Sequence, residues 1–187
     1  MVRWRAMDRI GPPLAVAVVA LVAIRLALLP GVDFWDTGEL QTVGPVMGTA
    51  HPTGFPTYVL LAWLANLVLS PFGEPALRMN LFSALCVAGA AALTVDLVRA
   101  LTRSLPLGVA AGLGLALTEF VWSIGTHAET HSLHLLLGAI LLRLLIAWAD
   151  GEPGRATDRR LLAAAVVYGL AVGNHSLTLL LAPAVGL

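Results

Sequence analysis

A short acidic segment near the N-terminus holds the side chains best suited to chemistry. Asp33, Asp36 and Glu39 fall within residues 33–39, and His51 follows twelve positions after Glu39. If Thr37 lies in a helical turn, the spacing of three puts Asp36 and Glu39 on one side of it. Such a carboxylate can act as a general base if a substrate hydroxyl comes within hydrogen-bond reach. The alternative is a solvated acidic loop, with residues 51–56 acting only as a rigid proline-containing turn.

A second group of titratable side chains lies in residues 126–134. On a continuous helix, His127, His131 and His134 would occupy positions i, i+4 and i+7 of one face, as zinc or haem ligands do. A helix that begins only near Glu129 would remove His127 from that face. A metal site formed by these three histidines therefore stands as the alternative to a substrate-facing cluster.

A polar pair interrupts the last apolar block. Asn174 and His175 follow Gly173 inside residues 161–187, which are otherwise almost entirely apolar. The pair can mark a helix break in which the Asn side chain bonds to the backbone. At membrane depth it is costly unless it has partners, so it is also a candidate ligand-binding pair.

Composition decides the class of protein. The 187 residues are 58% hydrophobic and only 12% charged, with a mean hydropathy of +0.86. About a quarter of the residues are charged in a soluble domain, so we predict an all-α, polytopic membrane protein. The 11 basic and 11 acidic residues give no argument for nucleic-acid binding. Cys86, the single cysteine, excludes an intrachain disulfide.

The apolar runs predict one transmembrane domain over residues 1–187. We expect an outer loop at residues 31–56 and an interfacial helix at residues 57–70, which is too short for an ordinary crossing. Because the chain ends inside an apolar segment, we also expect it to be the N-terminal part of a longer protein. The expected spans are residues 13–30, 77–100, 105–122, 131–149, 161–173 and 176–187.

The arginines decide between two topologies. If residues 57–70 do not cross, every basic cluster falls on one side, as the positive-inside rule expects of the cytoplasm. The N-terminus is then cytoplasmic and all five histidines lie at or near the extracytoplasmic face. This segregation of titratable groups is typical of a site at that face. The basic clusters are Arg3, Arg5 and Arg9; Arg99 and Arg103; and Arg155, Arg159 and Arg160.

Five short motifs, in order, resemble a membrane family first catalogued as a domain of unknown function. That family looks like a branch of the GT-C glycosyltransferases and includes a protein O-mannosyltransferase acting on plexin-type receptor domains. The resemblance covers nearly all of the chain from Asp33 onward. The motifs are Asp36-Thr37-Gly38-Glu39, His51-Pro52-x-Gly54-Phe55-Pro56, Pro71-Phe72-Gly73 with Arg78-x-Asn80-Leu81-x-Ser83-Ala84-Leu85, Phe120-x-Trp122 with Ala128-Glu129, and Gly169-Leu170-x-x-Gly173-Asn174-His175.

The resemblance implies a GT-C-like helix bundle that moves a sugar, such as mannose, from a polyprenyl phosphate donor to an acceptor hydroxyl of a protein or glycan. It implies Asp36 as the catalytic base, with Glu39 beside it. A metal or haem protein using the three histidines, or a transporter, is the alternative function. No cofactor is expected with certainty, and a role for a divalent metal stays open. The expected substrate-binding residues are His51, Arg78, Glu129, His131, Asn174 and His175.

Overall fold

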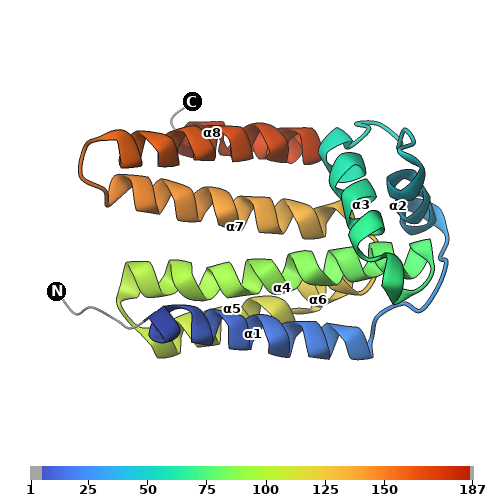
Figure 1. Ribbon diagram of the computed structural model, residues 1–187, viewed down its shortest axis with the longest axis horizontal. Coiled ribbons are helices and arrows are strands. Elements are labelled where there is room, and N and C mark those ends of the chain that lie inside the picture. The colour runs from blue at the N-terminus through green and yellow to red at the C-terminus, as the bar shows by residue number, and fades with distance from the viewer. Residues whose placement is uncertain (1–5, 186–187) are drawn as a thin grey trace.

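The computed structural model describes residues 6–185 and contains helices but no strand within that range. This confirms the predicted all-α class. Five helices run along the length of the molecule: α1 (Ala6–Leu26), α4 (Pro75–Thr102), α5 (Leu105–Leu117), α7 (Thr130–Ala149) and α8 (Arg155–Asn174) (Figure 1). The shorter elements are α2 (Trp35–Val46), α3 (Pro56–Val68), α6 (Glu119–Thr126), α9 (Ala182–Val185) and the 3₁₀ helices η1 (Ser70–Phe72) and η2 (Ser176–Leu181).

Helix α4 is the centre of the bundle and packs against α1, α5 and α7. Its small side chains and the glycines of α5 allow close approach. A Cβ added at Gly108 or Gly112 would lie 2.7 Å from the carbonyl oxygen of Val95 or Ala91, respectively. Small residues spaced by four bring helix backbones together in membranes, where apolar surface alone does not drive association. Two apolar clusters result, both of which include residues of α4.

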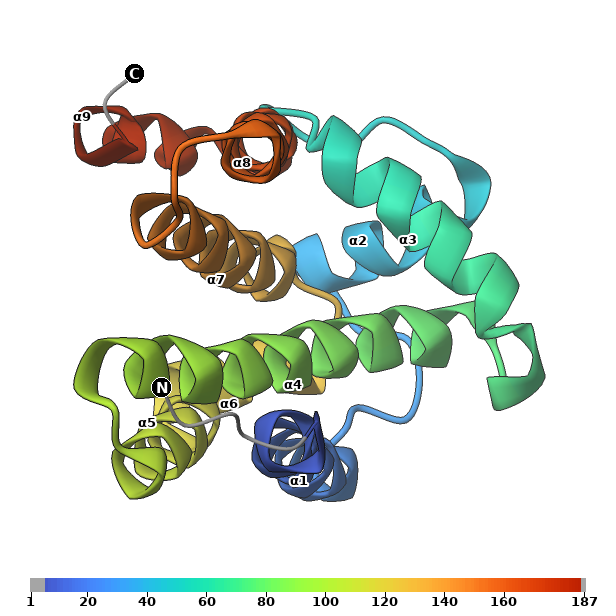
Figure 2. The same cartoon turned by 60° about the vertical axis from the view of Figure 1, so that its left-hand side comes forward.

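Helices α2 and α3 lie at one end of the bundle, and α3 runs across that end rather than along the long axis (Figures 1 and 2). A helix is thus present at the expected residues 57–70, as α3 with η1 following it. The outer loop expected at residues 31–56 instead contains α2. Gly44 makes the packing of α2 on α3 possible, because a Cβ there would lie 2.6 Å from that of Ala62.

Other helix bounds also differ from the expected ones. Residues 105–122 do not form one helix: α5 and α6 meet at an angle of 62° at Thr118, whose backbone is extended. Helix α8 begins at Arg155, because the charged residues before 161 are helical too. Residues 176–185 form η2 and α9 rather than one continuous span.

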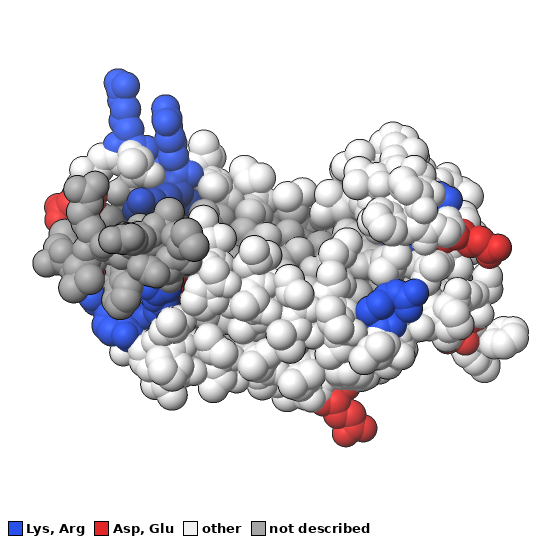
Figure 3. Space-filling model, turned by 60° about the horizontal axis from the view of Figure 1, so that its bottom comes forward, with Lys and Arg blue, Asp and Glu red and all other residues white. Residues whose placement is uncertain are grey.

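Two helices, α4 and α7, are long and apolar enough to cross a membrane, and there are three such spans if the bent pair α5 and α6 counts as one. The arrangement is that of a membrane helix bundle. Arg99 and Arg103 at the end of α4 lie at the opposite end of the bundle from α2 and α3, as does the start of α8 (Figure 1). Most basic side chains visible in Figure 3 gather at one end. Arg3 and Arg5 lie outside the described residues, as does the side chain of Arg9.

Candidate functional site

Most of the predicted site residues converge at the end of the bundle that α3 covers. A series of ring contacts joins three segments that are far apart in the sequence: the loop before α3, the first turn of α7 and the junction of α8 with η2. Ring centroids are 5.1 Å apart for His51 and Phe55, 5.9 Å for Phe55 and His175, 4.8 Å for His175 and His131, and 5.7 Å for His175 and His134. Because His51 is also bonded to Glu39, these contacts connect the acidic segment to the histidine cluster, and both are parts of one site.

A buried amide, Asn80 on α4, holds these segments together. Its Oδ1 accepts hydrogen bonds from Nε2 of Gln41 on α2 (3.0 Å) and from the backbone N–H of Ala128 before α7 (2.8 Å). Its Nδ2 donates to the carbonyl of Leu29 after α1 (2.9 Å). Gln41 in turn accepts from the backbone N–H of Asp33. Asn80 is fully buried, and the N–H of Ala128 and the carbonyl of Leu29 depend on it for a partner, whereas Nε2 of Gln41 also donates to the carbonyl of Gly31.

The first carboxylate–histidine pair consists of Glu39 and His51. One oxygen of Glu39 lies 2.6 Å from Nδ1 of His51, and the other accepts the backbone N–H of His51, also at 2.6 Å. The side-chain hydrogen bond lowers the pKa of Glu39 and raises the pKa of His51. His51 is thereby favoured in its protonated form.

Asp36 is next to this pair and differs from Glu39 in being unengaged. Its carboxylate makes no hydrogen bond within the described part of the chain, and it lies in the exposed first turn of α2. Ligand atoms of Asp36, Glu39 and His51 all lie within 4.8 Å of one another. The predicted placement of Asp36 and Glu39 on one helical face is confirmed. Asp36 is the acid of this group that remains available to a substrate hydroxyl.

Gly38 allows the acidic loop to fold onto α2. A Cβ at this position would lie 2.4 Å from the carbonyl oxygen of Asp33, which no side chain can tolerate without movement of the backbone. The same loop is held by the hydrogen bond from the backbone N–H of Phe34 to Oδ1 of Asp33. The fold of this loop therefore requires a glycine at position 38, between Asp36 and Glu39.

The second pair, Glu129 and His131, is anchored more firmly. Oε1 of Glu129 lies 2.9 Å from Nδ1 of His131 and also accepts the backbone N–H of His131, which caps α7. The backbone N–H of Glu129 donates to Oγ of Ser83 on α4. Burial disfavours the ionised form of Glu129, but the hydrogen bonds from His131 and Thr130 outweigh it and lower the pKa to about 2.

His175 lies between the two pairs. Burial is the main cause that lowers its pKa, and His131 acts in the same direction. Its Nδ1 accepts the backbone N–H of Leu177, so a neutral ring carries its proton on Nε2. His175 can therefore donate one hydrogen bond to a ligand oxygen at neutral pH.

Asn174, beside it, is fully buried. Its Nδ2 donates to the carbonyl of Thr130, whereas its Oδ1 has no partner among the described residues. A buried acceptor of this kind is normally satisfied by a water or a ligand. Gly173 brings α8 against α3, because a Cβ there would lie 2.6 Å from Oγ1 of Thr57.

Two of the predicted candidates lie apart from this group. Arg78 donates from Nε to the carbonyl of Gly73 and from Nη1 to Asn66. Asn66 is eleven positions along α3 from Phe55, roughly 16 Å at 1.5 Å per residue. Because α7 begins at Thr130, His127 precedes that helix in an extended conformation and does not share a helical face with His131 and His134. The three-histidine ligand set therefore loses its geometric basis.

The sequence analysis did not identify three polar residues of the site: Gln41, Asn80 and Ser83. Asn80 and Ser83 entered the sequence analysis only as part of a motif. Their signal was available, because two polar residues spaced by three lie inside an otherwise apolar stretch of α4 and must face a polar partner. The signal did not identify the partners, which are largely backbone groups of distant segments.

Comparisons with known proteins agree with one another. The family described as "Protein O-mannosyl-transferase TMEM260 N-terminal domain" matches residues 36–187. A mouse (Mus musculus) protein named "Protein O-mannosyl-transferase TMEM260" is 33% identical over 171 residues, which cover 88% of this chain and 24% of the mouse protein. The chain thus spans about a quarter of the length of that relative. No solved structure matches.

Proposed function

This chain belongs to the family of the N-terminal domain of protein O-mannosyl-transferase TMEM260, and on that premise we propose that it contributes the catalytic site of a GT-C-like membrane glycosyltransferase. The donor is a sugar, mannose in the first instance, on a polyprenyl phosphate. The acceptor is a hydroxyl of a protein or glycan on the extracytoplasmic side. The observation that carries this proposal is the unengaged Asp36 carboxylate beside two carboxylate–histidine pairs at one end of the bundle.

In the proposed reaction, the acceptor oxygen attacks the anomeric carbon while Asp36 takes its proton. A new C–O bond forms, and the bond between the anomeric carbon and the phosphate oxygen breaks. A single displacement inverts the configuration at that carbon. Glu39 is less suited to the role of base, because both of its oxygens are bonded to His51 and its pKa is lowered.

The leaving polyprenyl phosphate gains negative charge, which cations and hydrogen-bond donors stabilise. His51, whose pKa is raised, supplies a cation, and His175 supplies an N–H. His131 lies between His175 and Glu129 and completes this side of the site. Asn174 has a free acceptor for a sugar hydroxyl, and Glu129 offers its second oxygen. Arg78, on α4, is bonded to Gly73 and to Asn66 near the far end of α3, and does not join them without movement.

The orientation follows from charge. We propose that the arginine-rich end, with the N-terminus, is cytoplasmic and that the end with α2 and α3 is extracytoplasmic. Helix α3, which runs across the bundle, then lies in the membrane interface beside the site (Figure 1). A donor whose lipid part stays in the bilayer can reach the histidines at this depth.

The test is transfer of labelled mannose from polyprenyl phosphate mannose to a protein acceptor, in membranes of cells that express the gene in full. We expect Asp36→Asn to lower the rate by a factor on the order of 10² to 10⁴. The matched control is Asp33→Asn, which removes an acid of the same loop whose carboxylate bonds to its own neighbour. Equal rates for wild type and Asp36→Asn at equal expression would exclude Asp36 as the base.

Removal of divalent cations distinguishes a metal-independent mechanism from one in which an ion is bound at Asp36, Glu39 and His51. Asp36, Glu39 and His51 have the ligand types and proximity for an ion, but Glu39 already uses both oxygens on His51. We therefore expect transfer to continue in a chelating buffer. Loss of transfer on chelation, restored by Mg²⁺ or Mn²⁺, would assign the three residues to a metal instead.

A further inference from the structure

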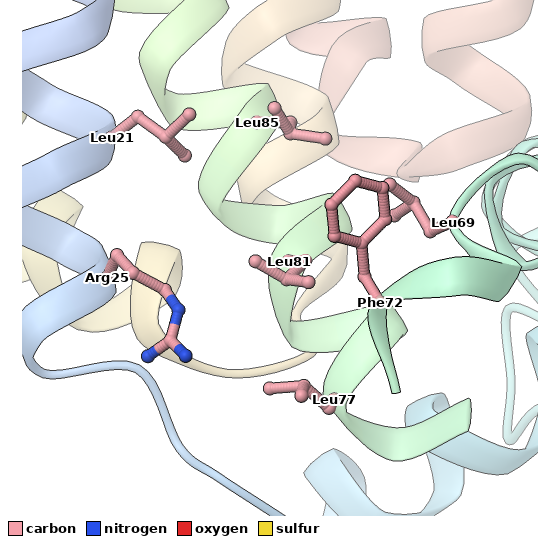
Figure 4. Close-up of a pocket in the computed structure, with 7 residues that line it drawn as sticks. All are labelled: Leu21, Arg25, Leu69, Phe72, Leu77, Leu81 and Leu85. Carbon is pink, nitrogen blue, oxygen red and sulfur yellow. The ribbon is translucent and has the colours of Figure 1, made fainter. Parts of the chain in front are cut away.

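An apolar groove lies on a different side of α4 from the candidate site. It has a volume of about 370 Å³ and is lined by five leucines, Phe72 and a single charged side chain, Arg25 (Figure 4). Leu21 and Arg25 come from α1, Leu77, Leu81 and Leu85 from α4, and the remaining two from the segment between α3 and α4. The groove therefore offers an apolar surface with one cation.

The groove is separate from the site because of helical geometry. Leu77, Leu81 and Leu85 are spaced by four and form one row along α4. Ser83, which bonds to Glu129, is two positions from Leu81, and at 100° per residue it faces nearly the opposite way. Helix α4 thus stands between the leucine row and the second carboxylate–histidine pair. A molecule in the groove does not contact the proposed reacting groups.

Arg25 has no partner in the described part of the chain. No hydrogen bond or ion pair is formed by its guanidinium there, whereas Arg78 and Arg143 are both engaged. Arg25 occupies the last turn of α1, at the same end of the bundle as the site. In Figure 4 its guanidinium lies on the side of α1 that faces the leucine row. An unpaired cation beside apolar surface at this depth is complementary to an amphiphile with an anionic head.

We propose that this groove binds one anionic phospholipid of the surrounding bilayer. Its phosphate is held by Arg25 and one acyl chain lies along Leu77, Leu81 and Leu85. These three residues cover about 12 Å of helix at 1.5 Å per residue, which suits the upper part of an acyl chain below a head group. The site would hold α1, α4 and η1 together on the side away from catalysis. This inference rests on the membrane setting and not on the proposed reaction.

The experiment uses the purified protein in detergent and measures retained lipid by native mass spectrometry, with phosphatidylglycerol and phosphatidylcholine of identical chains as probes. We expect one bound lipid per chain and about a tenfold preference for phosphatidylglycerol, the size of one charge-assisted contact. Arg25→Gln should abolish the preference. Leu81→Trp, which fills the groove, should remove binding of both lipids.

Matched controls are Arg103→Gln, a cation at the other end of α4, and Leu142→Trp, an exposed leucine of α7; both should retain the wild-type preference. If Leu81→Trp fails to fold, Arg25→Glu decides alone, since an exposed charge reversal should reverse the preference. An unchanged preference in Arg25→Gln, or no retained lipid in the wild type, would overturn the proposal.

A further arm distinguishes this lipid from the donor. Polyprenyl phosphate added in equal amount should not displace phosphatidylglycerol, and Arg25→Gln should leave mannose transfer unchanged. Displacement together with loss of transfer would make the groove part of the donor site and contradict the proposal. Failure of the transferase assignment would leave the lipid measurement unaffected.

Discussion

The two carboxylate–histidine pairs have similar contacts but different supports. The distances are 2.6 Å for Glu39 and His51 and 2.9 Å for Glu129 and His131, and both histidine side chains are 39% exposed. The carboxylate of the first pair is 32% exposed, against 21% in the second. Glu129 is fixed to α4 through Ser83, whereas Glu39 stands on α2, which Gln41 ties to Asn80.

From this difference we propose a division of roles. The second pair belongs to the bundle, because its carboxylate caps α7 and its backbone bonds to α4. The first pair belongs to a segment packed onto the end of the bundle, next to the unengaged Asp36. A fixed pair suits the binding of substrate, and a less constrained pair suits a step that needs approach and release. Both depend on Asn80, so the comparison can be tested by disturbing the common support and then each pair.

The largest effect is expected from Asn80→Leu. The change removes three hydrogen bonds and leaves the N–H of Ala128 and the carbonyl of Leu29 without a partner, whereas Gln41 keeps its bond to Gly31. At 1–3 kcal/mol for each unsatisfied group, the loss of unfolding free energy should be about 3 kcal/mol or more. Denaturant titration in micelles measures it, and mannose transfer should be lost together with stability. Asn66→Leu, at a half-buried amide bonded to Arg78, is the control and should cost less than about 1 kcal/mol.

The next effect concerns the contact of α8 with α3, beside the site. Gly173→Ala places a Cβ 2.6 Å from Oγ1 of Thr57 and should destabilise the protein by about 1–3 kcal/mol through overpacking. Thr57→Ala in the same chain should restore most of the loss. Gly169→Ala, one turn earlier where nothing lies within 4 Å of an added Cβ, should be neutral or slightly stabilising. Equal losses for the two glycines would mean that α8 does not pack on α3 as described.

A smaller effect distinguishes the support of the second pair from that of the first. Ser83→Ala removes the acceptor for the backbone N–H of Glu129 and should cost about 1 kcal/mol. Because the first pair does not use Ser83, His51→Gln should destabilise the single mutant and the wild type by the same amount. Strong coupling between Ser83 and His51 in this double-mutant cycle would show that the two pairs are not independently supported.

The smallest effect is the pH dependence of the first pair. The pKa of Glu39 is below 4.5, so its stabilisation is present above pH 4.5 and is lost as the pH falls through the lowered value. The pKa of His51 is above 6.5, so its stabilisation is complete below pH 6.5 and is lost as the pH rises through the raised value. The difference in unfolding free energy between wild type and His51→Gln should peak between pH 4.5 and 6.5, at less than about 1 kcal/mol. A difference independent of pH would exclude the ion pair.

Much of the fold was predictable because long apolar runs decide it. The ranges of α4 and α7 differ from expectation by at most two residues at either end. The break between α5 and α6 was hidden, because the apolar pattern continues through the bend at Thr118. Helix α2 was read as a loop because Gly38, Gly44 and Pro45 usually interrupt helices. Both glycines are instead required by close contacts with Asp33 and Ala62.

The sequence predicted most residues of the site, but not their hydrogen-bond partners. The spacing of Asp36 and Glu39 and the one-sided distribution of histidines place these residues correctly at one end. The pattern did not reveal which carboxylate holds which histidine, because Glu39 and His51 meet through a turn. Nor did it reveal Asn80 as the common support, since its partners are two backbone groups and one amide from distant segments.

The most direct test of the central claim is whether the acidic segment and the histidine cluster meet. Cysteines at Phe55 and His175, with Cys86→Ala, place one thiol on each side of the 5.9 Å ring contact. A protease site inserted in residues 151–154 then separates the chain into two fragments. If the two regions form one site, a short bismaleimide will keep the fragments joined, whereas cysteines at Phe72 and His175 will not be linked. Separation of the fragments in both cases would contradict the account.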